Sequence, residues 1–204
     1  MRRRTLVLAT GNQGKIRELK ALLRDLPLKF LTPEDFPEVS PPEEVGETFF
    51  DNAFLKARHW ALATGHLALA DDSGLEVDAL GGAPGIYSAR YAGPSATDED
   101  NIRKLLEKMK EVPWENRTAR FRCVIILYHP SGRWLKAEGV WEGLVATSPR
   151  GEEGFGYDPV FLPMEFDFKK SAAEISPETK NRLSHRGRAL AALKELLPDF
   201  LKGL

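Results

Sequence analysis

Residues 5–26 read TLVLATGNQGKIRELKALLRDL, and this stretch indicates the fold class. Thr5–Ala9 is a run of strand-forming residues that breaks at Thr10-Gly11-Asn12. From about Lys15 to Leu26, isoleucine and leucine recur at the spacing of one helical face, which predicts an amphipathic helix. A strand, a loop and a helix in this order form the repeating unit of α/β proteins.

The next segments continue this alternation. A second amphipathic helix is predicted to begin near Thr48 and to stop at Gly65, with Lys56 away from its apolar stripe. A short apolar strand, Leu67–Ala70, then runs into Asp71-Asp72-Ser73-Gly74. We therefore expect an acidic pair at the end of a strand.

The second half of the chain adds a hairpin and further helices. Thr97 with Asp100 forms a helix-start signature. Ala119–Tyr128 and Trp134–Trp141 flank a Pro-Ser-Gly turn and resemble a long β-hairpin. Ser176, followed by proline, is the expected N-cap ahead of an amphipathic C-terminal helix. This order predicts an α/β fold with a mixed sheet rather than an all-parallel one.

Length and composition limit the domain count and the partners. A chain of 204 residues with 42% hydrophobic content suits a single domain over residues 1–204. Lys plus Arg number 29 and Asp plus Glu number 30, so no surface for long nucleic acid is expected. The single cysteine, Cys123, lies in an apolar run and is expected to be a buried thiol.

The start of the chain carries a basic run but no apolar segment of useful length. Arg2 to Arg4 precede only the five strand-like residues Thr5–Ala9. That stretch is shorter than the apolar part of a signal peptide and far shorter than a membrane span. We therefore expect a cytoplasmic protein without a membrane anchor.

The loop after the first strand is a candidate phosphate cradle. Small and flexible residues join strand to helix, so backbone amides at the helix start can point at an anion while a lysine adds charge. The glycine spacing is shorter than in a P-loop, and an ordinary strand-to-helix turn is the alternative. The candidate residues are Thr10, Gly11, Asn12, Gln13, Gly14 and Lys15.

The acidic pair is a candidate metal site. Adjacent carboxylates such as Asp71 and Asp72 repel one another unless a metal, a cation or water separates them. Magnesium prefers oxygen ligands and is often held by one or two carboxylates together with substrate phosphates. Glu43 and Glu44 are further candidate ligands. The alternatives are a solvated turn for the aspartates and a charged loop for the glutamates.

Two later segments are candidates for binding a nucleotide base. In Gly154–Pro159 aromatic residues stand between glycines, so a base could stack on Phe155 while Asp158 bonds its edge. Lys180 and Ser184-His185-Arg186-Gly187 supply donors that suit the keto group of a purine and would be left unpaired against adenine. The alternatives are a turn anchored in the core and helix-terminal charges on a solvated face.

These segments, taken with Pro84–Arg90 (PGIYSAR), resemble the inosine triphosphate pyrophosphatase family over nearly the whole chain. The motifs ADDSGL, PGIYSAR, FGYDP and SHR occur in family order. The resemblance implies a two-lobed α/β fold, an extended mixed β-sheet flanked by helices with a nucleotide cleft between the lobes, and a homodimer. It also implies Mg²⁺-dependent hydrolysis of ITP, dITP and XTP to nucleoside monophosphate and pyrophosphate.

The resemblance also implies roles for individual residues. Asp72 would be the general base and, with Glu44, a magnesium ligand. The substrate would be bound by the loop Thr10, Gly11, Asn12, Gln13, Gly14 and Lys15, and by Lys56, Ser73, Phe155, Gly156, Tyr157, Asp158, Lys180, His185 and Arg186.

Three other functional classes remain as alternatives. A related pyrophosphatase acting on modified pyrimidine triphosphates would not favour keto purines. A non-catalytic nucleotide or nucleic-acid binder gains nothing from the adjacent Asp71 and Asp72, and the balanced charge disfavours extended nucleic acid. A purely structural interaction protein is disfavoured by the clustered titratable and glycine-rich motifs.

Overall fold

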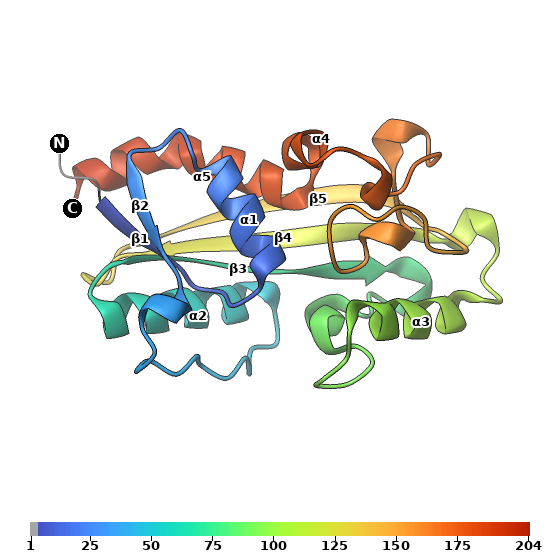
Figure 1. Ribbon diagram of the computed structural model, residues 1–204, viewed down its shortest axis with the longest axis horizontal. Coiled ribbons are helices and arrows are strands. Elements are labelled where there is room, and N and C mark those ends of the chain that lie inside the picture. The colour runs from blue at the N-terminus through green and yellow to red at the C-terminus, as the bar shows by residue number, and fades with distance from the viewer. Residues whose placement is uncertain (1–3) are drawn as a thin grey trace. The chain divides into compact units, whose positions relative to one another are not determined.

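The computed structural model describes residues 4–204, and its strands and α-helices alternate as far as residue 128 (Figure 1). Of the basic run at residues 2–4, only Arg4 lies in the described part. No helix within residues 4–204 is long and apolar enough to cross a membrane. The elements are β1 (Arg4–Leu8), α1 (Gln13–Leu22), β2 (Leu28–Leu31), α2 (Phe49–Thr64), β3 (Leu67–Val77), α3 (Asp98–Met109), β4 (Thr118–Tyr128), β5 (Trp134–Val145), β6 (Phe161–Pro163), α4 (Pro177–Leu183) and α5 (His185–Lys202).

Within residues 4–204, six strands form one sheet in the order β2-β1-β3-β4-β5-β6. Strand β1 pairs in parallel with both β2 and β3, whereas β5 and β6 are antiparallel. The predicted α/β fold with a mixed sheet is therefore confirmed. The predicted nucleotide cleft between lobes stays a prediction.

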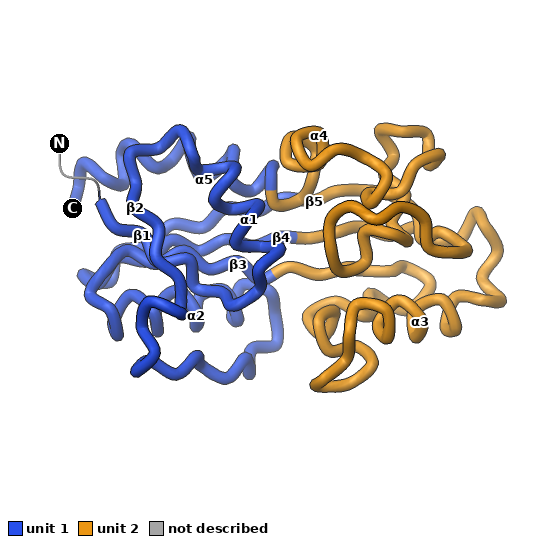
Figure 2. The backbone as a smooth tube through the Cα atoms, in the orientation of Figure 1, with its two compact units in different colours: residues 1–72, 123–139, 187–204 blue, residues 73–122, 140–186 orange. Residues whose placement is uncertain are grey.

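The contacts within the chain divide it into two compact units (Figure 2). Unit 1 comprises Met1–Asp72, Cys123–Gly139 and Gly187–Leu204, and unit 2 comprises Ser73–Arg122 and Val140–Arg186. Strands β3, β4 and β5 each contribute residues to both units. The boundary on β3 falls between Asp72 and Ser73.

Unit 1 has helices on both faces of its part of the sheet (Figure 1). Helices α1 and α5 bury Leu19, Leu190 and Leu193 against alternate residues of β1, β3 and β4. Helix α2 covers the opposite face with residues such as Ala57 and Trp60, which are 0% and 2% exposed. Since successive strand side chains point to opposite faces, β3 is buried on both sides here.

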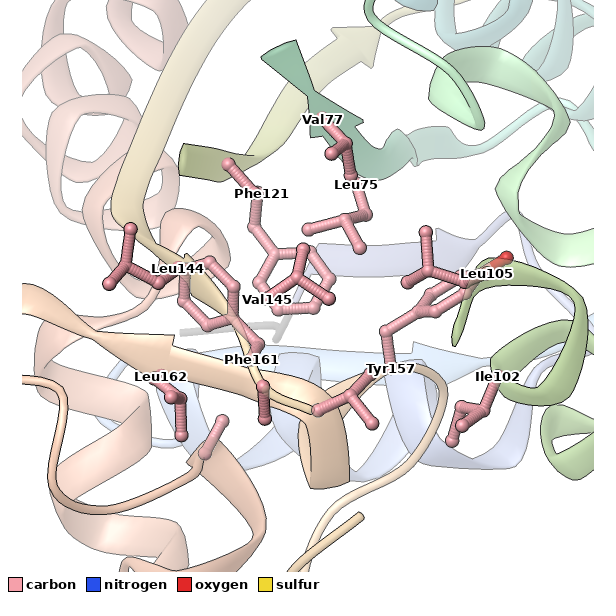
Figure 3. Close-up of a cluster of buried hydrophobic side chains, with 14 of the residues drawn as sticks. Leu75, Val77, Ile102, Leu105, Phe121, Leu144, Val145, Tyr157, Phe161 and Leu162 are labelled. Atoms are coloured by element: carbon pink, nitrogen blue, oxygen red, sulfur yellow. The ribbon is translucent and has the colours of Figure 1, made fainter. Parts of the chain in front are cut away.

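Unit 2 has its own apolar core, drawn in Figure 3. Leu75 of β3, Leu105 of α3, Phe121 of β4 and Phe161 of β6 gather in this cluster together with Tyr157. Helix α3 begins as predicted, because Thr97 and Asp100 exchange side-chain and backbone hydrogen bonds in a capping box.

The strand that carries the acidic pair does not end where the sequence suggested. We expected a short strand over Leu67–Ala70, but β3 continues to Val77, so Asp71 and Asp72 lie within the strand. The end of the apolar run at Ala70 did not mark the end of the strand, because the carboxylates that follow it are also buried, at 1% and 6% exposure. Tertiary partners, described below, make polar strand positions compatible with burial.

Other boundary predictions are largely confirmed. Thr48 caps α2, and the helix ends at Gly65. Ser176 caps α4, and its side chain accepts a hydrogen bond from the Thr179 amide. Helix α1 is shorter than predicted, because it ends at Leu22. Cys123 is fully buried, as expected.

A buried arginine joins several elements of unit 2. Arg117 is 3% exposed, and its guanidinium donates to four backbone carbonyls at 2.7–3.1 Å. Burial lowers its pKa, but arginine remains charged in proteins. The acceptors are the carbonyl oxygens of Met109, Val112, Val145 and Ala146. A charge placed at the last turn of α3 also complements the helix dipole.

Arg117→Ala is expected to lower the free energy of unfolding by about 3 kcal/mol, because it removes charge-assisted hydrogen bonds and leaves buried carbonyls unpaired. Urea denaturation followed by circular dichroism measures this loss. The matched control is Arg103→Ala, since the Arg103 side chain is 76% exposed and its removal is expected to leave stability unchanged. Equal stability of Arg117→Ala and the parent protein would contradict the role assigned to Arg117.

Candidate active site

Two adjacent buried carboxylates on β3 each pair with a different lysine. Lys15 Nζ lies 3.1 Å from Asp71 Oδ1, and Lys56 Nζ lies 3.2 Å from Asp72 Oδ1. Lys15 comes from α1 and Lys56 from α2, which cover opposite faces of the sheet (Figure 1). Neighbouring residues of a strand point to opposite faces of the sheet, so the side chains of Asp71 and Asp72 point away from each other and their mutual repulsion is reduced. Each carboxylate also has its own lysine partner.

The loop before α1 presents its residues to solvent. Gly11, Asn12 and Gln13 are exposed, and Asn12 caps the helix by accepting the Lys15 amide at 3.1 Å. The Gln13 side chain donates to Glu34 Oε1 at 3.2 Å. The loop thus offers a helix N-terminus with a lysine in its first turn, which is an arrangement that attracts anions.

Helix α2 brings two polar side chains onto Asp72 from positions one turn apart. Asn52 and Lys56 are 0% and 9% exposed, and Asn52 Nδ2 donates to Asp72 Oδ2 at 3.4 Å. Asn52 Oδ1 also accepts the Gly46 amide at 2.8 Å. Of the two adjacent glutamates, Glu44 contacts Lys56 Nζ, at 3.4 Å. The loop before α2 is therefore tied to Asp72.

The resulting acidic–lysine cluster, which consists of Lys15, Glu44, Lys56, Asp71 and Asp72, has three carboxylates for two ammonium groups. Burial raises the pKa of Asp72, and the nearby lysines offset this effect only in part. Burial acts to lower the pKa of Lys56, but the surrounding carboxylates outweigh it and the pKa is raised. Burial is thus the main cause of the Asp72 shift, whereas the surrounding carboxylates cause the Lys56 shift. Three carboxylates around two ammonium groups leave a surplus of negative charge, which favours the binding of a cation.

Among the described residues, no group of three or more His, Cys, Asp or Glu side chains has the arrangement of a metal site. Glu44 and Asp72 nevertheless converge on one point, because both contact the Nζ atom of Lys56. Two carboxylate ligands suit a metal such as magnesium, which completes its coordination with water and phosphate oxygens. The donor set therefore fits magnesium when substrate supplies the remaining ligands.

A second group of predicted residues lies within unit 2 around Phe155. Lys180 Nζ is 4.6 Å and Arg186 Cζ is 5.7 Å from the centre of the Phe155 ring. Arg186 also donates to Ser73 Oγ at 2.9 Å. We call Ser73, Phe155, Asp158, Lys180 and Arg186 the aromatic–cation group. It places two cations beside a half-buried aromatic face.

Asp158 is the buried acceptor that holds two members of this group, Phe155 and Lys180. It is 2% exposed, and its Oδ2 accepts both the Phe155 amide at 3.0 Å and Lys180 Nζ at 2.5 Å. Gly154, with φ of +75°, leaves room for this carboxylate, because a Cβ atom there would overlap Asp158 Oδ2. Asp158 Oδ2 is thus engaged within the protein. The predicted bond from Asp158 to a base edge stays a prediction.

The donors near the start of α5 are buried, so the alternative of charges on a solvated face is wrong. Lys180, His185 and Arg186 are 4%, 4% and 1% exposed. The His185 ring stacks on Phe121, with 4.6 Å between ring centres and an interplanar angle of 12°. Lys180 lies in the short helix α4. The SHR motif thus forms part of the interior of unit 2.

Several contacts of the predicted residues involve side chains that sequence reasoning did not select. Asn52 reaches Asp72, Asp98 accepts the Gly156 amide at 2.8 Å, and Ser88 O accepts the Tyr157 hydroxyl at 2.6 Å. The spacing of four residues between Asn52 and Lys56 is a signal that places both on one helical face. The contacts of Asp98 and Ser88 are long-range and have no local sequence signal.

The mixed sheet and the acidic–lysine cluster on its β3 strand define the chain as an α/β protein with a polar site on an internal strand. Comparison with known proteins gives the family. The chain belongs to the Ham1 family, whose family model matches residues 6–196. The family resemblance predicted from the motifs is thereby confirmed.

Named relatives and a solved structure agree with this assignment. The chain is 53% identical over 192 residues to a dITP/XTP pyrophosphatase of Geobacter sulfurreducens, which covers 94% of this chain and 96% of the relative. It is 51% identical over 209 residues to a dITP/XTP pyrophosphatase of Nitratidesulfovibrio vulgaris, with 100% of both chains covered. A HAM1 protein from Coxiella burnetii has a similar structure, with a TM-score of 0.86, 46% identity and coverage of 96% and 99%.

Gly154→Ala is expected to disrupt the loop that carries Phe155, because the new Cβ would meet Asp158 Oδ2 and the backbone angle is unfavourable for alanine. Gly132→Ala is the matched control, since Gly132 also has a positive φ, of +92°, but has open space around it. The control is expected to lose about 1 kcal/mol of stability and Gly154→Ala clearly more. Thermal unfolding compares the variants, and equal losses would argue against the Asp158 contact.

Proposed function

We infer that this chain is a nucleoside triphosphate pyrophosphatase, which hydrolyses nonstandard purine nucleoside triphosphates such as ITP, dITP and XTP to nucleoside monophosphate and pyrophosphate. Family membership and the names of the relatives support this function. The structural observation that carries it is Lys56, whose Nζ lies within 3.4 Å of both Asp72 and Glu44. The site thus combines a cation for phosphate with carboxylates for metal and water.

Phosphate binding is assigned to the two lysines of the acidic–lysine cluster and to the loop before α1. Lys15 and Lys56 each have a carboxylate partner, which holds the ammonium group in place before substrate arrives. A prearranged cation loses little entropy on binding and stabilises charge that develops on the leaving pyrophosphate. The exposed residues Gly11 to Gln13 add the amides of a helix start.

Magnesium is the proposed cofactor, held by Glu44 and Asp72. Both are oxygen ligands, and the surplus negative charge of the cluster supports a divalent cation there. When bound, magnesium supplies Lewis-acid neutralisation of the phosphate oxygens. The protein's part is to keep the two carboxylates together, which Lys56 and Asn52 do by their contacts.

Asp72 is the proposed general base. Burial raises its pKa, and a carboxylate with a raised pKa accepts a proton more readily at neutral pH than an exposed one. Asn52 and Lys56 bind its two oxygens and fix its orientation. In the proposed step Asp72 takes a proton from a water that attacks the α-phosphorus in line, and pyrophosphate leaves.

Recognition of the base is assigned to the aromatic–cation group. A purine would stack on Phe155, and Lys180 and Arg186 would donate to its keto group. The amino group of adenine is itself a donor and cannot accept hydrogen bonds from Lys180 and Arg186, so ATP is disfavoured. Ser73 is assigned a substrate contact, and Gly156, Tyr157, Asp158 and His185 are assigned to the walls of the base site.

The proposal extends to the organisation of the protein. One functional domain over residues 1–204 is supported by coverage of 94–100% of the chain by the two pyrophosphatase relatives. We further propose a cytoplasmic homodimer. The substrate is a small nucleotide, and neither nucleic acid nor a membrane is a proposed partner.

Product identity tests the reaction. With magnesium present, ITP and XTP are expected to give monophosphate and pyrophosphate. ATP is expected to be turned over far more slowly because its amino group does not match the donors, and dUTP because it is a pyrimidine rather than a purine nucleotide. Anion-exchange chromatography resolves the products of each substrate. Release of free phosphate with a diphosphate, or a preference for dUTP, would overturn the proposed reaction.

Asp72→Asn is expected to lower kcat for ITP by about 10²–10⁴-fold, the usual contribution of a general base, while nucleotide binding persists. Steady-state kinetics measure kcat, and calorimetry measures binding. Asp78→Asn is the control, because Asp78 follows β3 but pairs with Arg120 at 3.0 Å on the surface. Unchanged turnover of Asp72→Asn would remove Asp72 from the mechanism.

A further inference from the structure

The motif Pro84–Arg90 has no role in the reaction described above, yet it is firmly bound within unit 2. Its residues Gly85–Arg90 form a 3₁₀ helix in which Ser88 is 5% exposed. Ser88 Oγ accepts the Leu75 amide at 2.9 Å and donates to Gly85 O at 2.6 Å. The side chain of Ser88 therefore fixes this short helix to strand β3.

The backbone of Ser88 is also bound to the loop of the aromatic–cation group. Its carbonyl oxygen accepts the Tyr157 hydroxyl at 2.6 Å, and Tyr157 is 5% exposed. Burial raises the pKa of Tyr157, so the hydroxyl remains a donor at physiological pH. Tyr157 stands two residues after Phe155, and its ring belongs to the unit 2 core (Figure 3).

Asp98 binds the same loop from another direction. It is the first residue of α3, and its Oδ2 accepts the Gly156 amide at 2.8 Å. Gly156 lies directly between Phe155 and Tyr157. Unlike Ser88, Asp98 is exposed, so a change at this position does not alter the core of unit 2.

Phe155 is thus held by hydrogen bonds to the residues on its C-terminal side. The Phe155 amide donates to Asp158, and the Gly156 amide donates to Asp98. The Tyr157 hydroxyl donates to the carbonyl oxygen of Ser88. The ring keeps Lys180 and Arg186 at 4.6 and 5.7 Å only while the loop keeps this conformation. A ring that shifts changes which base edge meets the two donors.

We propose that Asp98 and Ser88 are positioning residues for Phe155, and that they set the selectivity of the enzyme between keto and amino purines. This inference rests on the proposed function, which assigns the base to Phe155. Neither residue contacts the base in this scheme. Each acts through the backbone or side chain of the residues that follow Phe155.

Asp98→Ala tests the exposed contact, since it removes the acceptor for the Gly156 amide. The ratio of kcat/KM for ITP to that for ATP is expected to fall by about threefold to tenfold, which corresponds to the loss of one hydrogen bond. Asp98→Asn keeps an acceptor oxygen and is expected to retain the parent ratio. Glu99→Ala, at the neighbouring exposed position, is the control for loss of charge at the start of α3.

Tyr157→Phe tests the contact with Ser88, because it removes only a hydroxyl and preserves the apolar ring. It is expected to lower the same ratio, and the double variant Asp98→Ala/Tyr157→Phe is expected to lower it further. Thermal unfolding is measured for every variant. A purely structural role would lower the unfolding temperature, or reduce turnover of ITP and ATP equally, without changing the ratio.

The outcomes separate this inference from the function on which it rests. If the parent enzyme does not prefer ITP over ATP, the proposed function fails before any variant is compared. If the parent prefers ITP and both single variants keep its ratio, the positioning role is overturned and the function stands. Equal loss of the ratio in Asp98→Asn and Asp98→Ala would also overturn it, because the acceptor oxygen would then be irrelevant.

Discussion

The pairing of Lys15 and Lys56 with two consecutive buried aspartates on β3 is the interaction on which the arrangement of unit 1 depends. A buried charge without a partner is strongly unfavourable. Lys15 meets Asp71 at 3.1 Å and Lys56 meets Asp72 at 3.2 Å, so α1 and α2 must each present a lysine to the strand. Strand geometry sends the two carboxylates to opposite faces. The pairing of each lysine with an aspartate therefore also positions the loops that precede α1 and α2.

The cluster is not arranged for maximal stability. Glu44 adds a third carboxylate on Lys56, and burial raises the pKa of Asp72. As pH rises from the ordinary range of a carboxyl group through this raised pKa, ionisation of Asp72 costs more in the folded than in the unfolded protein, so its contribution to stability falls. Such a cost is typical of groups retained for chemistry. A bound cation would relieve it, which links the proposed magnesium site to the stability of the protein.

In unit 2 the proposed site for the base depends on backbone hydrogen bonds as much as on side chains. Phe155 is followed by an amide bound to Asp98 and by a hydroxyl bound to Ser88. The close approach of Asp158 to Gly154 leaves no room for a Cβ atom. A stacking platform is sequence-tolerant by itself. Selectivity must therefore come from donors whose placement relative to the ring is fixed, and these contacts fix the ring.

The sequence by itself determined the mixed α/β fold, the caps of α2, α3 and α4, and the residue types of the site, because periodicity, capping and turn chemistry are local. It misplaced the acidic pair at a strand end, because burial of Asp71 and Asp72 depends on Lys15 and Lys56, which are distant in the chain. Only the tertiary structure decided that each aspartate has its own lysine, that His185 and Arg186 are interior, and that Ser88 and Asp98 bind the loop of Phe155. These contacts join residues from 16 to 113 positions apart, and no local pattern encodes a partner at that separation.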